Sequence, residues 1–146
     1  MKTFYTQGGY AGAKYEETKG LRTQDIAKLV RAELKEIKGF KFSVTSDYNH
    51  IRVEVKDIPE GVKIFGKDGS EYYKSGAFKV RSFEWGGEYY SPEISEVTKK
   101  IKSILEQYNY DDSDGQIDYF DTRFYKTVCI NWDLEKAAKD ALINTK

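Results

Sequence analysis

The chain has 146 residues, 39% hydrophobic and 33% charged, which is typical of one globular domain and unlike a disordered chain. Its 24 Lys and Arg residues balance its 24 Asp and Glu residues, so the formal net charge is zero. This balance excludes a protein that holds duplex DNA by a general positive charge, and it also excludes an acidic mimic of nucleic acid. Any contact with nucleic acid must therefore come from a local basic surface.

The single cysteine, Cys129, has no partner for an internal disulfide, which is typical of a reducing compartment. The N-terminal residues contain no apolar stretch of signal-peptide length. No segment approaches the ~20 apolar residues of a membrane span. We therefore expect a cytoplasmic protein without membrane contact.

The first part of the chain divides into a lead-in and a helix. Residues 1–20 are rich in glycine, tyrosine and charge, so we expect them to be loosely ordered, with a single domain over residues 21–146. A first helix is predicted from a Thr23 cap to Gly39. Its apolar face is Ile26, Leu29, Val30, Leu34 and Ile37.

Two alternating segments follow the helix. Apolar and polar residues alternate over Phe40–Thr45 and again over Ile51–Lys56, with polar residues 46–50 between them. This pattern predicts a β-hairpin with one buried face. Residues 57–90 contain further turn signals and short apolar runs, including one at Ala77–Trp85, and they predict a β-ribbon added to the domain.

The C-terminal half contains two more predicted helices and a long strand. Ser91 and Pro92 predict the start of a second helix, whose apolar residues step by three and four. A strand is predicted over Ile117–Trp132, and Asp133 is predicted to cap a final helix. Together the elements predict an α+β fold with an antiparallel sheet of about four to six strands. Two helices should cover one face of the sheet, with the C-terminal helix at an edge or end.

Several carboxylates surround Gly115 in the segment 111–121, as in a calcium-binding loop. The EF-hand spacing fails, because the first ligand position falls on Tyr110 and the twelfth on Asp121 in place of glutamate. One hypothesis is a turn whose Asp side chains bond their own backbone. The alternative is an acid/base or metal-assisted enzyme site. Its ligands would be Asp112, Asp114 and Asp118.

Two further features indicate binding. Basic residues lie three, four and three positions apart on the first helix, as a phosphate-binding row would, although Asp25, Glu33 and Glu36 dilute their charge. The row comprises Lys28, Arg31, Lys35 and Lys38. Tyrosine is abundant, with 12 residues, and it occurs twice as two neighbouring residues. Neighbours on a strand point to opposite faces, so one tyrosine of each pair would point outward, where its ring could bind a partner. These pairs are Tyr72-Tyr73 and Tyr89-Tyr90. Either feature also fits an ordinary solvated helix or a half-buried strand.

Catalysis has little support. The single histidine, His50, lies in the hairpin turn without a nucleophile at a telling spacing, and Cys129 lies in an apolar run. The sequence holds no phosphate loop, zinc-ligand set or nucleophile elbow. We expect neither an enzyme nor a cofactor.

Two segments together resemble a known family. One joins Ile26–Lys35 to Phe40–Ser46 and Ile51–Val53, and the other is Asp111–Asp121 followed by Phe124-Tyr125. Their order is similar to that in the large polyvalent protein-associated domain family numbered twenty-nine, over residues 22–56 and 91–131. That family comprises small α+β modules of phages and conjugative elements. The resemblance implies DNA transfer, processing or defence evasion as a setting, and it implies no catalytic residue.

The sequence thus predicts a noncatalytic phage or mobile-element accessory protein that binds a host protein or nucleic acid. The basic row, the surplus tyrosines and the missing catalytic motifs support this prediction. The choice between the two partners and the oligomeric state stay open.

Overall fold

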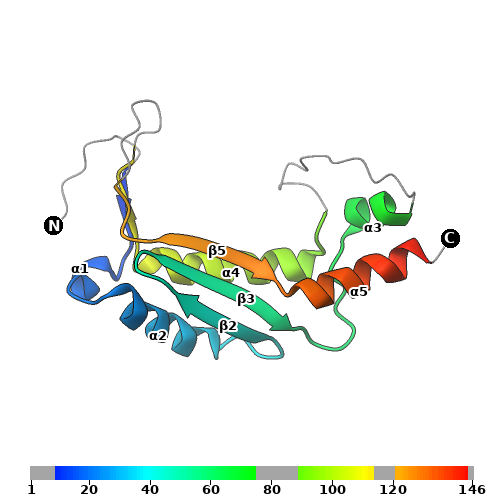
Figure 1. The fold of residues 1–146 in the computed structure, drawn as a ribbon, viewed down its shortest axis with the longest axis horizontal. Coiled ribbons are helices and arrows are strands. Elements are labelled where there is room, and N and C mark those ends of the chain that lie inside the picture. The colour runs from blue at the N-terminus through cyan, green and yellow to red at the C-terminus, as the bar shows by residue number, and fades with distance from the viewer. Residues whose placement is uncertain (1–8, 75–88, 114–120, 145–146) are drawn as a thin grey trace.

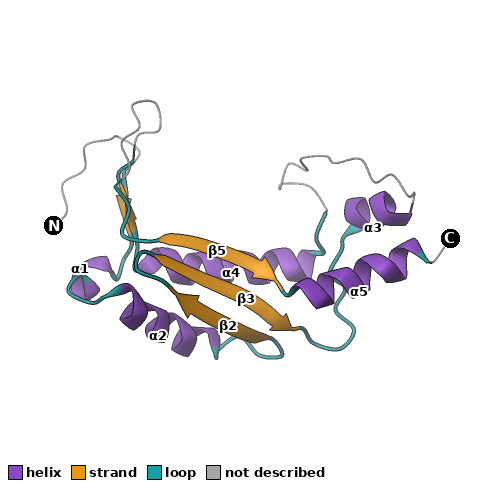
Figure 2. Ribbon diagram, in the orientation of Figure 1, coloured by secondary structure: helices purple, strands orange, loops and turns teal. Residues whose placement is uncertain are grey.

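The computed structural model describes residues 9–74, 89–113 and 121–144, which form an α+β chain (Figures 1 and 2). In chain order the elements are β1 (Tyr10–Ala11), α1 (Tyr15–Thr18), α2 (Thr23–Leu34), β2 (Lys41–Ser46), β3 (His50–Asp57), α3 (Lys67–Lys74), α4 (Pro92–Gln107), β4 (Tyr110–Asp111), β5 (Tyr125–Ile130) and α5 (Trp132–Ile143). Within the described ranges, no helix is long and apolar enough to cross a membrane.

Within the part of the chain that the structure describes, the main sheet has three strands in the order β2–β3–β5. The predicted hairpin is confirmed, since β2 and β3 pair antiparallel with Val44 opposite Val53. The prediction of a wholly antiparallel sheet is wrong, because β5 pairs parallel to β3 with Val128 opposite Val53. The physical reason is the long connection through α4, which can carry the chain back to the end of the sheet where β3 begins. The main sheet also has fewer strands than predicted, and β1 and β4 form a separate two-stranded ribbon.

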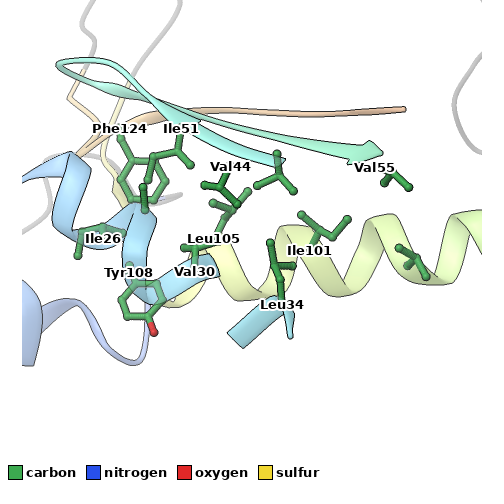
Figure 3. Packing of buried hydrophobic residues seen from close by; sticks show 13 residues of the cluster. Ile26, Val30, Leu34, Val44, Ile51, Val55, Ile101, Leu105, Tyr108 and Phe124 are labelled. Carbon is green, nitrogen blue, oxygen red and sulfur yellow. The ribbon is translucent and has the colours of Figure 1, made fainter. Parts of the chain in front are cut away.

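Helices α2 and α4 lie together on one face of the main sheet (Figure 3). Alternate residues of β3, namely Ile51, Val53 and Val55, point toward them and are fully buried. The apolar stripes of the two helices meet these strands, as their spacing predicts. The core comprises Ile26, Ala27, Val30, Leu34, Val44, Ile51, Val53, Val55, Val97, Ile101, Leu105, Tyr108 and Phe124.

The cap of helix α2 is one residue before the predicted Thr23, and the helix ends several residues before the predicted Gly39. Arg22 is the capping residue and Thr23 the first helical residue, while Asp25 accepts a hydrogen bond from the backbone N–H of Arg22 at 3.3 Å. The helix ends at Leu34, and Gly39 ends the turns that follow it. The φ of Gly39 is +85°, a conformation that favours glycine.

The described part of residues 57–90 does not form the predicted ribbon, because Lys67–Lys74 is helix α3. Gly66 and Gly69 are among the turn signals of this region, yet Gly69 lies within α3 and contacts the backbone of Tyr89. A Cβ on Gly69 would lie 2.3 Å from the carbonyl oxygen of Tyr89, so glycine permits a close approach of two backbones. The predicted strand at Ala77–Trp85 falls within residues 75–88, outside the described residues.

The C-terminal elements differ from the predicted long strand. Strand β5 covers only Tyr125–Ile130, and α5 starts at once after it. Asn131 caps α5 in place of the predicted Asp133, since its side chain accepts hydrogen bonds from the N–H groups of Asp133 and Leu134. Residues 9–20, expected as a loosely ordered lead-in, form β1 and α1, and β1 pairs with β4.

Candidate binding cleft

A cleft of about 720 Å³ lies where three parts of the chain meet: the α1–α2 junction, the β2–β3 turn and the connection from β4 to β5. Cationic and aromatic side chains line it together. The lining residues are Tyr15, Lys19, Leu21, Arg22, Thr23, Gln24, Ser46, Asp47, Tyr48, Asn49, Tyr110, Thr122 and Arg123.

Arg123 fixes one wall of the cleft. Its guanidinium donates to the carbonyl oxygen of Tyr108 at 2.7 Å and also to the carbonyls of Thr18 and Leu21. It lies 5.2 Å from the ring centroid of Tyr15, in cation–π contact. Burial lowers the pKa of Arg123 from its ordinary value, and the group stays charged because that value is so high. Arg123 therefore ties α1 to the end of α4 and contributes positive charge to the cleft.

Asn109 is buried next to this wall and holds the backbones of Tyr110 and Phe124 in place. This residue is only 2% exposed, and its side-chain amide pairs with the backbone of Phe124 like a neighbouring strand. The Nδ2 group donates to the Phe124 carbonyl at 3.1 Å, and Oδ1 accepts from the Phe124 N–H at 3.2 Å. Oδ1 also accepts from the N–H of Tyr110 at 2.9 Å. The Tyr110 ring contacts Tyr15 edge-on at 5.2 Å, so Asn109 helps to hold the aromatic floor.

The mouth of the cleft presents an exposed ring and two cations. Tyr48 in the β2–β3 turn is 95% exposed, and its carbonyl accepts a hydrogen bond from the Thr23 hydroxyl at 2.8 Å. Lys19 and Arg22 stand nearby, each in an exposed ion pair within its own helix or turn. Exposed ion pairs of this kind cost little to exchange for a ligand. The mouth can therefore stack a planar group and neutralise an anion.

The predicted basic row lies elsewhere, on α2 and on the turns that follow it. Lys28, Lys35 and Lys38 are exposed, and Lys38 donates to the Lys35 carbonyl at 3.4 Å. Arg31 has a structural contact, since its Nη2 donates to the carbonyl of Val44 at 2.9 Å. None of the four lines the cleft.

The predicted tyrosine pairs come together in a second apolar cluster. Tyr73 and Tyr89 are buried and share a 2.5 Å hydrogen bond between their hydroxyls, while Tyr72 and Tyr90 are half-buried. The hydroxyl of Tyr90 donates to Glu135 at 3.0 Å. Burial raises the pKa of both Tyr89 and Tyr90. These contacts indicate packing between α3 and α5, and they leave the cleft to other tyrosines.

The acidic segment is only partly described. Asp112 is fully buried, and its N–H donates to the carbonyl of Asp121 at 2.7 Å. The Tyr110 hydroxyl donates to Asp121 at 2.8 Å. Asp114 and Asp118 lie outside the described residues. Over the described ranges, no three His, Cys, Asp or Glu side chains cluster as a metal site would require.

His50 and Cys129 both lie on the face of the main sheet that α2 and α4 do not cover. His50 Nε2 is 2.7 Å from the Thr127 hydroxyl. Burial raises the pKa of the Cys129 thiol, which disfavours the nucleophilic thiolate.

Sequence reasoning missed the residues that build the cleft. Tyr48 lies among the polar residues of the hairpin turn, and nothing in its spacing links it to Tyr15 or Arg123. The one available signal was a tyrosine inside a polar hairpin turn, where packing does not call for an aromatic ring. The chain matches no protein-family model, no curated protein and no solved structure.

Proposed function

We propose that this protein is a noncatalytic binding module that holds single-stranded nucleic acid in the cleft, as an accessory protein of a phage or mobile element. The observation that carries the proposal is the meeting of the exposed Tyr48 ring with Lys19, Arg22 and Arg123 around one hollow. The support for the mobile-element setting is the resemblance of residues 22–56 and 91–131 to a family of such elements.

Single-stranded nucleic acid fits this combination of groups better than duplex does. Unpaired bases offer flat faces that stack on tyrosine, and their phosphates lie within reach of neighbouring cations. A duplex hides its base faces and is held through many phosphate contacts, which a chain of zero net charge is poorly suited to make. The small number of cations at the cleft predicts a short site and a shallow salt dependence.

The test is fluorescence anisotropy of a labelled 12-nucleotide single strand, as DNA and as RNA, at several salt concentrations. Tyr48→Ala should weaken binding about fivefold to a hundredfold, because stacking on one ring contributes about 1–3 kcal/mol per base. Arg22→Glu should weaken binding and lower the slope of affinity against salt by about one. The duplex of the same sequence should bind more weakly.

Matched controls are available on other surfaces. Tyr125→Ala removes a half-exposed tyrosine outside the cleft, and Lys136→Glu reverses a charge on α5. Both should bind like the wild type. Lys28→Glu with Lys35→Glu tests the exposed side of α2 separately. Loss of binding in that double variant alone would place the site on α2 and overturn the cleft, and absence of binding in the wild type would overturn nucleic acid as the ligand.

A further inference from the structure

The candidate cleft contains an acidic side chain, although the ligand proposed for it carries negative charge. Among the described residues that line the cleft, Asp47 of the β2–β3 turn is the single Asp or Glu. The residue is exposed, and its carboxylate makes no hydrogen bond or ion pair with the described part of the chain. A carboxylate repels phosphate groups, so Asp47 does not serve to bind the backbone of a strand.

The cations of the cleft do not neutralise Asp47. Lys19 and Arg22 each pair with a different carboxylate close to them in the chain, and Arg123 donates to backbone carbonyls. The backbone N–H of Asp47 donates to the His50 carbonyl at 2.8 Å, so the hairpin turn fixes the backbone that carries the carboxylate. The cleft thus contains two acceptor oxygens that the described residues leave open to a ligand.

The residue that follows Asp47 is the stacking residue of the cleft. Tyr48 is 95% exposed, and both residues line the same hollow at the end of the sheet nearest α1 (Figure 1). Bases of single strands stack on such rings and are read by hydrogen bonds to their edges. A base that stacks on Tyr48 therefore has its hydrogen-bonding edge in the hollow that Asp47 lines.

An ionised carboxylate only accepts hydrogen bonds, so it selects a base by the donors of that base. Guanine has two neighbouring donors, N1–H and the N2 amino group, which match the two oxygens of one carboxylate. Adenine and cytosine each have one amino group beside an acceptor nitrogen, and thymine and uracil have one N–H between two carbonyls. In these four bases an acceptor would face one of the carboxylate oxygens, which is unfavourable.

We propose that Asp47 makes the cleft selective for guanine, whose N1–H and N2 amino group donate to the carboxylate while its ring stacks on Tyr48. This proposal rests on the function proposed above and names the base that the cleft prefers within a single strand. The side-chain amides of Gln24 and Asn49 also line the cleft and have no partner among the described residues, so they can donate to the O6 atom of the same base.

The test compares unlabelled 12-nucleotide thymine strands that differ at one central base, as competitors of the labelled strand in the anisotropy assay. A central guanine should raise the affinity about fivefold to a hundredfold over thymine, because a bidentate contact discriminates between bases by that factor. Adenine and cytosine should raise it much less, and hypoxanthine, which lacks the N2 amino group, should lose most of the gain. Equal affinity for all these strands would overturn the guanine preference and leave the single-strand function standing, whereas absence of binding to every strand would overturn both.

Asp47→Asn is the matching change on the protein. Its side chain keeps its shape, but one acceptor becomes an amino group that opposes a donor of guanine. The variant should lose the preference for guanine and bind the all-thymine strand slightly more tightly, because one negative charge near the phosphates is gone. A guanine preference equal to that of the wild type would overturn the role of Asp47. Asp133→Asn, at an exposed carboxylate of α5 outside the cleft, is the matched control and should keep the preference.

A free guanine nucleotide presents the same base edge, so guanosine monophosphate is a further competitor in the same assay. A strand has additional phosphates on both sides of the base, within reach of the cations of the cleft. The nucleotide should therefore compete about tenfold more weakly than the guanine-containing strand, or more weakly still. Equal competition, lost in Asp47→Asn, would support the guanine site and overturn single-stranded nucleic acid as its ligand.

Discussion

Asn109→Ala should destabilise the fold far more than the loss of one polar side chain would suggest. The substitution removes the acceptor of the Phe124 N–H at 3.2 Å and the closer donor to the Phe124 carbonyl, at 3.1 Å. The Thr122 hydroxyl still donates to that carbonyl at 3.4 Å, and Phe124 is 1% exposed. A buried backbone group without a partner costs about 1–3 kcal/mol. The unpaired Phe124 N–H therefore predicts a loss of about 1–3 kcal/mol, out of the about 5–15 kcal/mol that holds a typical domain folded.

The assay is urea unfolding followed by far-UV circular dichroism. With a slope of about 2 kcal/mol per M, the midpoint should fall by about 0.5–1.5 M at an unchanged slope. Asn144→Ala, at the exposed end of α5, is the control and should shift the midpoint little. A shift of Asn109→Ala as small as that of the control would refute the reasoning, since it would mean that water or neighbouring groups replace the amide.

Three further predictions concern packing and charge. Gly12→Ala should lower the melting temperature by several degrees, because a Cβ there would lie 1.9 Å from the Glu106 carbonyl oxygen; an unchanged value in a thermal scan would contradict this close approach. The hydrogen bond from Asn131 lowers the pKa of Glu54, so its ionised form stabilises the fold above about pH 4.3 and that contribution fades as pH falls through the lowered pKa. The difference in unfolding free energy between wild type and Glu54→Gln should therefore shrink in acid, and a constant difference would count against the bond. Arg123→Ala should raise amide exchange in α1 well before the rest of the chain, and uniform exchange would show that the guanidinium does not hold that helix.

Elements set by local patterns could be predicted from the sequence. The alternation around Val44 and Val53 defines the hairpin, and Ser91 begins α4 as a cap whose hydroxyl accepts from the Ile94 N–H at 3.2 Å. In each case the deciding contact lies within a few positions along the chain. Local patterns also sufficed for the class of fold and for the face on which α2 and α4 pack.

The remaining elements depend on contacts between distant residues. Gly69 is a helical residue whose glycine is explained by the backbone of Tyr89, so its local sequence indicated a turn. The direction of β5 relative to β3 depends on the path of the chain through α4, and alternation cannot distinguish parallel from antiparallel pairing.

The candidate cleft was beyond sequence reasoning for the same reason. Arg123 donates to the backbone carbonyls of Thr18, Leu21 and Tyr108. Every residue has a backbone carbonyl, so the sequence cannot indicate which ones a side chain will contact. The regular spacing of the basic row suggests a binding surface, yet Arg31 of that row donates a hydrogen bond to the Val44 carbonyl of β2. Regular spacing reveals helix faces, whereas the cleft is assembled from single residues of unrelated segments.

The parallel pairing of β3 with β5 also has a consequence for how the chain folds as it is synthesised. His50 and Thr127, which hydrogen-bond across these strands, are 77 positions apart. Helix α2 and the hairpin can form early from local contacts. The side of β3 that pairs with β5 stays unpaired until the ribosome has synthesised β5. The slow step of folding should be the docking of β5, so substitutions that weaken its contacts with β3 should slow folding at least as much as equivalent ones in the hairpin. Nascent chains stalled before residue 125 should bind chaperones that recognise exposed strands, and release them once α5 has been made.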